Sequence, residues 1–127
     1  MSTTGTTRKA LLCQLEPSIE RELKSVLTTP QIQMEADTCQ DVKECVRKAK
    51  SNQPQVVFCS SAAILLRLRR SLAKVVPVIV VSRNPETKEW LDAIEAGASD
   101  YCAPPFETRQ VEWMLQSAKQ QFAMTAA

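Results

Sequence analysis

Apolar runs and helical patterns alternate five times along this chain of 127 residues. Residues 10–15, 55–60 and 77–82 are apolar almost throughout, which is typical of strands buried on both faces of a sheet. Residues 31–36 instead alternate apolar and polar side chains, which predicts a half-exposed strand at a sheet edge. Residues 99–103 predict a short fifth strand.

A helical pattern follows each of these strands. Pro17 suits the first turn of the first helix, and Asp37 with Gln40 resembles a capping box ahead of the second. Residues 84–86 combine an N-cap Asn, a Pro and an early Glu, and Gly97 has the position of a C-terminal glycine that ends the fourth helix. The residues expected to face the core are Ile19, Leu23, Val26 and Leu27; Val42, Val46 and Ala49; Leu65, Leu68 and Leu72; and Val111, Met114, Leu115, Ala118 and Phe122. The fourth helix carries Trp90, Leu91 and Ile94, and Trp90 is interpreted as a core-boundary residue.

Strands that alternate with helices at this spacing predict right-handed βαβ units and a parallel sheet covered on both faces. With the second strand at an edge, the expected fold is α/β and flavodoxin-like: a (βα)5 three-layer sandwich whose five-stranded parallel sheet has the order 2-1-3-4-5. We expect one domain over residues 8–122, with loose termini at 1–7 and 123–127.

Charge and residue usage exclude several classes of function. Sixteen Lys and Arg against fourteen Asp and Glu give a net charge of +2, so no general attraction to nucleic acid or to an anionic membrane is expected. The apolar stretch 75–81 is too short to span a bilayer, and residues 1–9 lack the apolar segment of a secretory signal. We therefore expect a cytoplasmic protein.

The absence of histidine is more restrictive still. It removes every His-dependent nucleophile, general base and metal site. The five cysteines are odd in number and have no C-x-x-C spacing, which argues against a disulfide framework and a thiolate zinc site. The glycines, Gly5 and Gly97, make no phosphate-binding loop. We expect no cofactor, no metal and no enzymatic activity.

The stretch "PVIVVS…AIEAGASDYCAPPFE" resembles the second half of a response-regulator receiver domain of two-component signalling. In that family a strand ending in Ser or Thr leads to a helix that closes in A-G-A-x-D-Y, and the next strand ends in Lys-Pro-Phe. The resemblance is specific in this half and continues by pattern alone over the first half of the chain. It implies the same fold and a place in phosphorelay signal transduction.

The family transfers a phosphoryl group to an Asp at the end of its third strand. A pair of acids after the first strand holds Mg²⁺, and a Lys after the fifth strand neutralises the acyl phosphate. The resemblance assigns the acid pair to Gln14 and Leu15, the acceptor to Ser60 and the lysine to Pro104. If the register shifts by one, Cys59 or Ser61 takes the acceptor position.

Two further features of the family are kept. Ser82 provides the hydroxyl after the fourth strand, and Tyr101 matches the aromatic residue of the family's switch. Pro105 matches the proline that follows the family's lysine through a cis peptide bond, so the Pro104–Pro105 bond is expected to be cis. The resemblance thus indicates a degenerate phosphorylation pocket, that is, a pseudo-receiver that works through protein–protein contacts.

Two alternatives remain open. Cys13, Cys59 and Cys102 fall near strand ends and could form a redox-responsive thiol group, although small buried hydrophobes are the ordinary interpretation; Cys39 and Cys45 are interpreted as packing residues. The second alternative is a phosphorelay receiver whose acceptor is displaced, with Glu16 replacing the acid pair one residue too late.

Trp113 is the candidate interface residue. The helical pattern places it opposite the core-facing residues of the last helix, in solvent, and exposed tryptophan is enriched at interfaces. In receiver domains the fourth helix, fifth strand and fifth helix form the usual output or dimerisation face. We expect a protein partner or self-association there, including a possible homodimer. The basic segment 67–70 with Lys74 is interpreted as a solvated face, with an acidic partner as the alternative.

Overall fold

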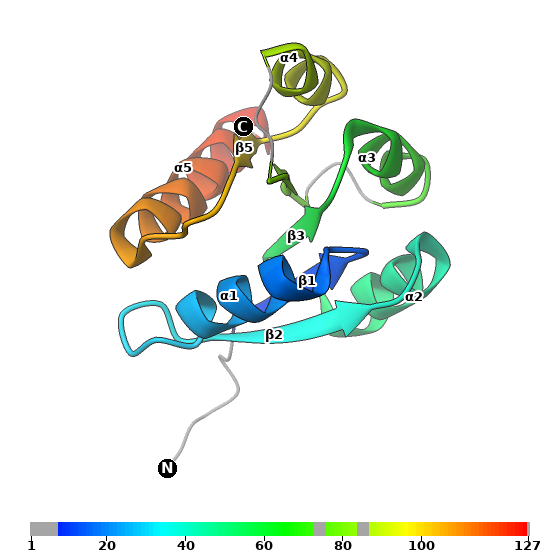
Figure 1. Ribbon diagram of the computed structural model, residues 1–127. Helices are drawn as coiled ribbons and strands as arrows, with labels where there is room; N and C mark the ends of the chain where they lie inside the picture. The colour runs from blue at the N-terminus through cyan, green and yellow to red at the C-terminus, as the bar shows by residue number, and fades with distance from the viewer. Residues whose placement is uncertain (1–7, 73–75, 84–86, 127) are drawn as a thin grey trace.

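In a computed structural model of the protein, the described residues are 8–72, 76–83 and 87–126, and they form five strands and five helices in strict alternation (Figure 1). The elements are β1 (Arg8–Cys13), α1 (Pro17–Leu27), β2 (Met34–Cys39), α2 (Val42–Asn52), β3 (Val56–Cys59), α3 (Ala62–Arg69), β4 (Val78–Val81), α4 (Thr87–Glu95), β5 (Asp100–Cys102) and α5 (Thr108–Ala126). All strand pairs are parallel and the order is β2-β1-β3-β4-β5. The predicted flavodoxin-like fold is confirmed.

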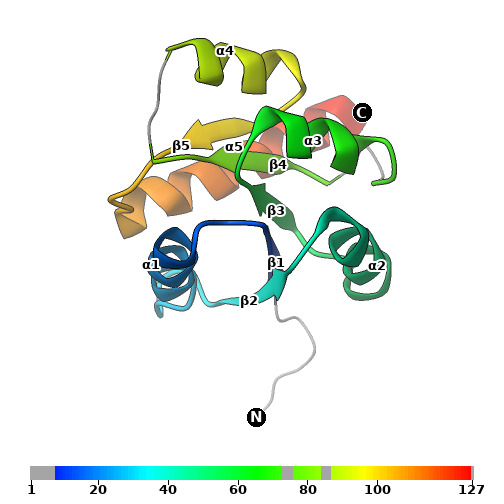
Figure 2. The same cartoon turned by 45° about the vertical axis from the view of Figure 1, so that its right-hand side comes forward.

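The sheet separates two apolar cores. Alternate residues of each strand face opposite sides, so Leu12 packs with α1 and α5 while Leu11 packs with α2, α3 and α4. Figure 2 shows these two helical layers on either side of the sheet. The central strands β1, β3 and β4 are buried almost throughout, as their apolar composition predicts. No helix within the described residues is long and apolar enough to cross a membrane.

The edge strand β2 lies later in the chain than expected. Residues 31–33 form a turn, in which the Gln33 N–H donates to the Thr29 carbonyl at 2.7 Å and Gln33 has a φ of 53°. The strand then runs through Asp37 and Thr38, which an edge tolerates because one side of the strand meets solvent. The prediction of an edge was right, and the predicted bounds 31–36 were wrong.

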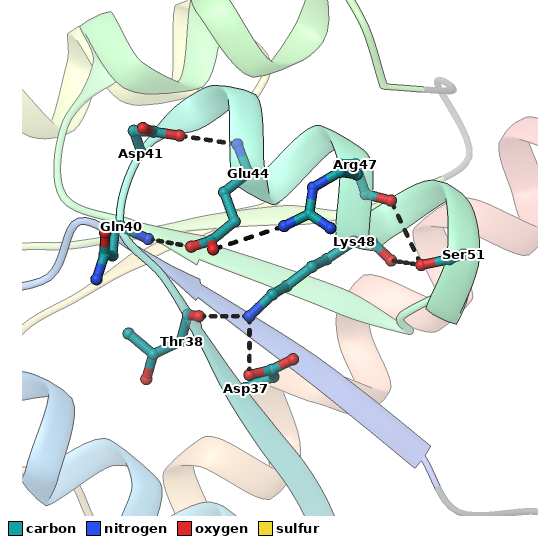
Figure 3. A network of polar contacts seen from close by, with 8 residues as sticks. All are labelled: Asp37, Thr38, Gln40, Asp41, Glu44, Arg47, Lys48 and Ser51. Atoms are coloured by element: carbon teal, nitrogen blue, oxygen red, sulfur yellow. Dashed lines mark hydrogen bonds and ion pairs between the residues drawn. The ribbon is translucent and has the colours of Figure 1, made fainter.

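The cap of α2 also differs from the predicted pair. Asp41 is the N-cap and its carboxylate accepts from the Glu44 N–H at 2.8 Å, while the Glu44 carboxylate accepts from the Gln40 N–H at 2.7 Å (Figure 3). Asp37 lies inside β2 and does not cap the helix. The capping chemistry was recognised four residues too early, because both segments offer an Asp with a Gln or Glu three residues later.

Asp37 is instead one end of a link between β2 and α2. The Lys48 ammonium lies 3.2 Å from the Asp37 carboxylate and donates to the Thr38 carbonyl at 2.9 Å (Figure 3). The hydrogen bond and charge of Asp37 raise the pKa of Lys48. This contact fixes the polar half of α2 against the sheet edge.

The end of α4 has the geometry that its sequence predicts. Gly97 has a φ of +103°, its N–H donates to the Ile94 carbonyl, and the Ala98 N–H donates to the Ala93 carbonyl, both at 3.0 Å. These two hydrogen bonds form a Schellman motif, which requires a residue that adopts a positive φ. The predicted cap at residues 84–86 lies outside the described residues, as do Lys74 and the side chain of Phe122.

The apolar residues of α4 do not face the core. Trp90, Leu91 and Ile94 are 46%, 47% and 42% exposed, and Ala93 is the fully buried residue of this helix. The small Ala93 side chain lets the helix lie close to the sheet, so the larger side chains project outward. The interpretation of Trp90 as a core-boundary residue was therefore wrong.

Candidate functional site

A small cavity lies at the carboxyl end of the sheet, between the starts of α3 and α4. Ser60 and Ser82, two of the residues expected at the degenerate pocket, line this space of about 210 Å³ together with Tyr101, the expected switch-like aromatic residue. They follow β3, follow β4 and lie within β5, so parallel strand ends bring them together. The remaining lining residues are Ser61, Ala62, Val80, Glu89 and Asp92.

Glu89 of α4 organises the hydroxyls of this cavity. One of its carboxylate oxygens accepts from the Ser82 hydroxyl at 3.4 Å and from the Tyr101 hydroxyl at 3.3 Å. Burial is the largest of the effects that raise the pKa of Tyr101, so this phenol stays protonated and able to donate. Glu89 could not be recognised from the sequence, because an acid in the first turn of a helix is usually a solvated end residue.

The expected counterparts of the acid pair lie elsewhere. Gln14 follows β1 with a φ of 55°, is exposed, and its N–H donates to the Cys39 carbonyl at 3.3 Å. Leu15 is 8% exposed and packs in the core with α1 and α5. Pro104 is half-buried, and the Pro104–Pro105 bond is cis, as expected. Neither Gln14, Leu15 nor Pro104 lines the cavity.

Glu16, the possible substitute for the acid pair, is held by a cation. The Arg83 guanidinium lies 2.9 Å from its carboxylate and connects the β1–α1 loop to the segment after β4. The hydrogen bond from Arg83 lowers the pKa of Glu16, and Ser18 adds a second hydrogen bond. In the described part of the chain, no group of three or more His, Cys, Asp or Glu residues could hold a metal ion.

Four of the five cysteines gather in one core. Cys13 pairs in register with Cys39 of β2 and with Cys59 of β3, and Cys45 of α2 packs in the same core. Cys102 lies in the core on the opposite face of the sheet. The structure therefore brings Cys13 and Cys59 together as expected, separates Cys102 from them, and adds two residues that had been interpreted as packing alone.

The thiols of this group differ in acidity. A hydrogen bond from Cys45 lowers the pKa of Cys13 although burial opposes it, and hydrogen bonds to Cys13 and Cys39 raise the pKa of Cys45. Burial raises the pKa of Cys59 and of Cys102 to about 12. All five thiols are buried, and the contact with Cys45 is what lowers the pKa of Cys13.

Trp113 is exposed, as its helical position predicts. It is 65% accessible to solvent on α5, opposite Val111, Met114 and Ala118, which are buried. Its side chain thus contributes apolar surface outside the core.

A larger cavity of about 990 Å³ lies at the amino end of the sheet, where the strands begin. Its lining consists mainly of apolar and amide side chains, and the charged residues Arg8, Lys50 and Glu112 also line it. Among the described residues that line it, no hydroxyl pair or carboxylate pair converges, so the smaller cavity carries the chemistry that the sequence singled out.

Solved structures with the same arrangement of strands and helices show which fold this is. The receiver domain of a response regulator from Clostridium thermocellum superposes with a TM-score of 0.73 at 19% identity, over 93% of this chain and 98% of that one. The signal receiver domain of an HD domain-containing protein from Pseudomonas fluorescens Pf-5 gives 0.77 at 16%, over 99% and 96%. The chain has the receiver fold.

NtrX from Brucella abortus, solved in complex with ADP, is also similar, with a TM-score of 0.77 and 18% identity. The match covers 95% of this chain and 28% of NtrX, so this chain corresponds to one part of that longer protein. No protein-family model and no curated protein sequence matches the chain.

Proposed function

We propose that this protein is a receiver-like signalling module that works through protein–protein contacts without aspartyl phosphorylation. The observation that carries the proposal is the set of neutral or buried side chains at the four positions where the resemblance requires charge. Gln14 is neutral, Leu15 is in the core, Ser60 follows β3, and Pro104 follows β5. The receiver fold of the similar structures supports the same kind of module.

Phosphoryl transfer depends on a metal ion and cations that stabilise the charge of the transferred group, and Mg²⁺ requires several oxygen ligands. Here Glu16 is paired with Arg83, and Glu89 accepts from the Ser82 and Tyr101 hydroxyls. These two carboxylates are engaged within the chain and do not form a metal cage.

The contact surface that we propose consists of α4, β5 and α5. Trp113 of α5 and Trp90 and Ile94 of α4 are exposed apolar side chains on these helices. Buried tryptophans contribute strongly at interfaces, so a protein partner or a second copy of the chain would gain most from contact here. If this surface supports self-association, Trp113→Ala weakens it by about tenfold or more; an unchanged dissociation constant would refute the role of Trp113 in it.

The proposal is tested by titration with Mg²⁺ and beryllofluoride, a phosphoryl mimic that adds to the acceptor carboxylate of ordinary receivers. We expect tryptophan fluorescence and amide NMR shifts to stay at their starting values. A saturable change that requires Mg²⁺ would favour the alternative, a receiver with a displaced acceptor. An ordinary receiver domain in the same buffer serves as the positive control.

A second candidate function is redox response, and the contact between Cys13 and Cys45 favours it. It predicts that Cys13 reacts with iodoacetamide at a lower pH than an ordinary thiol, because the hydrogen bond from Cys45 stabilises its thiolate. If all five thiols remain inert until the protein unfolds, the redox function is excluded and packing is their role.

A further inference from the structure

Two neighbouring helices of the molecule carry opposite charge. α3 and α4 lie side by side over the same face of the sheet (Figure 2). Residues 62–70 contain three arginines and no acid, whereas α4 contains three acids and one lysine, Lys88. A basic strip therefore lies beside an acidic strip.

Arg69 connects the C-terminal end of α3 to the C-terminal end of α4. Its guanidinium donates to the Gly97 carbonyl, just beyond the end of α4, at 3.3 Å, and to the Val76 carbonyl at 2.8 Å. Arg69 therefore lies on the α4 side of α3, and so does Leu66, which precedes it by three residues. Both helices connect parallel strands, so they run in the same direction with their C-terminal ends level.

Each helix presents an apolar residue and a charged residue one turn apart. On α3 these are Leu66, which is 51% exposed, and the exposed Arg70 at the C-cap. On α4 they are Leu91, which is 47% exposed, and the exposed Glu95. Asp92 lines the cavity at the start of α3, so Glu95, three residues later, lies on the same flank of α4. Within the described residues neither Arg70 nor Glu95 makes an ion pair.

We propose that this α3–α4 face (Leu66, Arg70, Leu91 and Glu95) binds a second copy of the same chain about a twofold axis parallel to the two helices. Rotation about that axis places α3 of each protomer on α4 of the other. Arg70 then meets Glu95 of the partner subunit, and Leu66 meets Leu91 of the partner subunit. Each pair occurs twice, which closes the assembly at a dimer.

The charge pattern favours a second copy over other partners. A polyanion such as nucleic acid would match the arginines of α3 but would be repelled by the acids of α4. A second copy matches both strips at once. It also covers the apolar side chains of Leu66 and Leu91, which a partner that made only charge contacts would leave exposed to water. The order of one apolar and one charged residue at matching heights is what a self-complementary surface needs.

The inference goes beyond the proposed function, because its α3 half is outside the α4–β5–α5 surface. It leaves Trp113 available to a different partner. Phosphorylation assays do not test the dimer, and the dimer variants do not test phosphorylation. Either proposal can therefore be refuted while the other stands.

Sedimentation equilibrium of charge-reversal variants tests the inference. We expect the protein to dimerise, and Arg70→Glu and Glu95→Arg each to raise the dissociation constant by about tenfold or more, since each creates two like-charge contacts. The double variant restores both pairs with exchanged sign and should return to within about threefold of the original value. Raising NaCl from about 50 mM to about 500 mM should weaken the original dimer.

Matched controls change the same charges elsewhere. Lys50→Glu on α2 and Glu22→Arg on α1 alter exposed residues away from this face, and both should leave the dissociation constant within about twofold. Circular dichroism confirms that each variant is folded, and Leu66→Ser provides an uncharged disruption of the same contact.

Three results would overturn the inference. They are a protein that stays monomeric up to about 500 µM, single reversals that leave a dimer intact, and a double variant that recovers nothing. A dimer that Trp113→Ala dissociates but Arg70→Glu does not would move self-association to the α4–β5–α5 surface.

Discussion

Gly97 shows how a single residue sets the position of the strand that follows. Its φ of +103° ends α4 in a Schellman motif, and within the part of the chain that the structure describes a Cβ added there would meet the Arg69 Nε alone, at 3.9 Å. Space is therefore available and the cost of a side chain is the backbone conformation itself.

Gly97→Ala should accordingly lower the free energy of unfolding by about 1–2 kcal/mol. Gly97→Asn should lower it by less, because asparagine tolerates positive φ better than alanine. Urea unfolding followed by circular dichroism measures both. Equal stability of the alanine variant and the original protein would contradict this role.

Burial sets the behaviour of Cys59 and Cys102. A pKa raised to about 12 keeps each thiol protonated across the ordinary pH range, so neither should react with iodoacetamide in the folded protein at about pH 8. Mass spectrometry of the alkylated protein identifies the labelled residues. Rapid labelling of Cys59 or Cys102 below about pH 8 would show that the folded core opens there.

The Glu16–Arg83 pair gives a pH dependence with a defined sign. The folded-state pKa of Glu16 lies below its unfolded value, so the pair contributes stability above the unfolded pKa of about 4.3. That contribution is lost as the pH falls through the lower folded-state pKa. Both groups are exposed, so Glu16→Gln should change stability little at neutral pH, and the difference should disappear in acid. A larger difference in acid than at neutral pH would contradict the assignment.

At the scale of elements, substitutions near the start of α2 distinguish the predicted cap, Asp37, from the observed cap, Asp41. Asp41→Ala should cost about 1 kcal/mol and increase hydrogen exchange in the first turn of α2, whereas Asp41→Ser should retain most of the stability. Asp37→Ala should instead affect the contact of Lys48 with β2. If Asp37→Ala alone exposed the first turn of α2, the observed cap would be wrong.

The sequence predicts the order and type of every element because strand burial and helix period repeat consistently along the chain. It does not predict where β2 begins. Ile32 lies in the turn before the strand, and because its side chain is buried it satisfies the alternating pattern without belonging to β2. It also fails for α4, where Trp90, Leu91 and Ile94 follow a helical spacing typical of a core face. Periodicity shows that side chains share a face of a helix but not whether another layer covers that face.

The candidate site divides in the same way. Ser60, Ser82 and Tyr101 could be placed together from the sequence, because parallel strand ends converge at one edge of the sheet. Glu89 could not, since its role depends on how α4 lies over β4 and β5. The cysteines show the same limit: Cys45 joins Cys13 and Cys39 only through the packing of α2 on the sheet.

At the scale of the whole molecule, the chain has the receiver-type sheet and its helical layers, and the proposed function adds that the charged groups of phosphoryl transfer are replaced. Within the described residues, the exposed large apolar side chains lie on the helices, where contact with another protein is possible, and they include Trp113 on α5 and Leu66 and Leu91 of the α3–α4 face. Function in this account depends on those surfaces and not on a chemical step at the strand ends.

The most direct test is incubation with Mg²⁺ and acetyl phosphate, followed by intact-protein mass spectrometry, with an ordinary receiver domain treated in parallel. The account predicts that the mass of this protein does not change under conditions that modify the control. A stoichiometric phosphoryl adduct on one of its aspartates would contradict it.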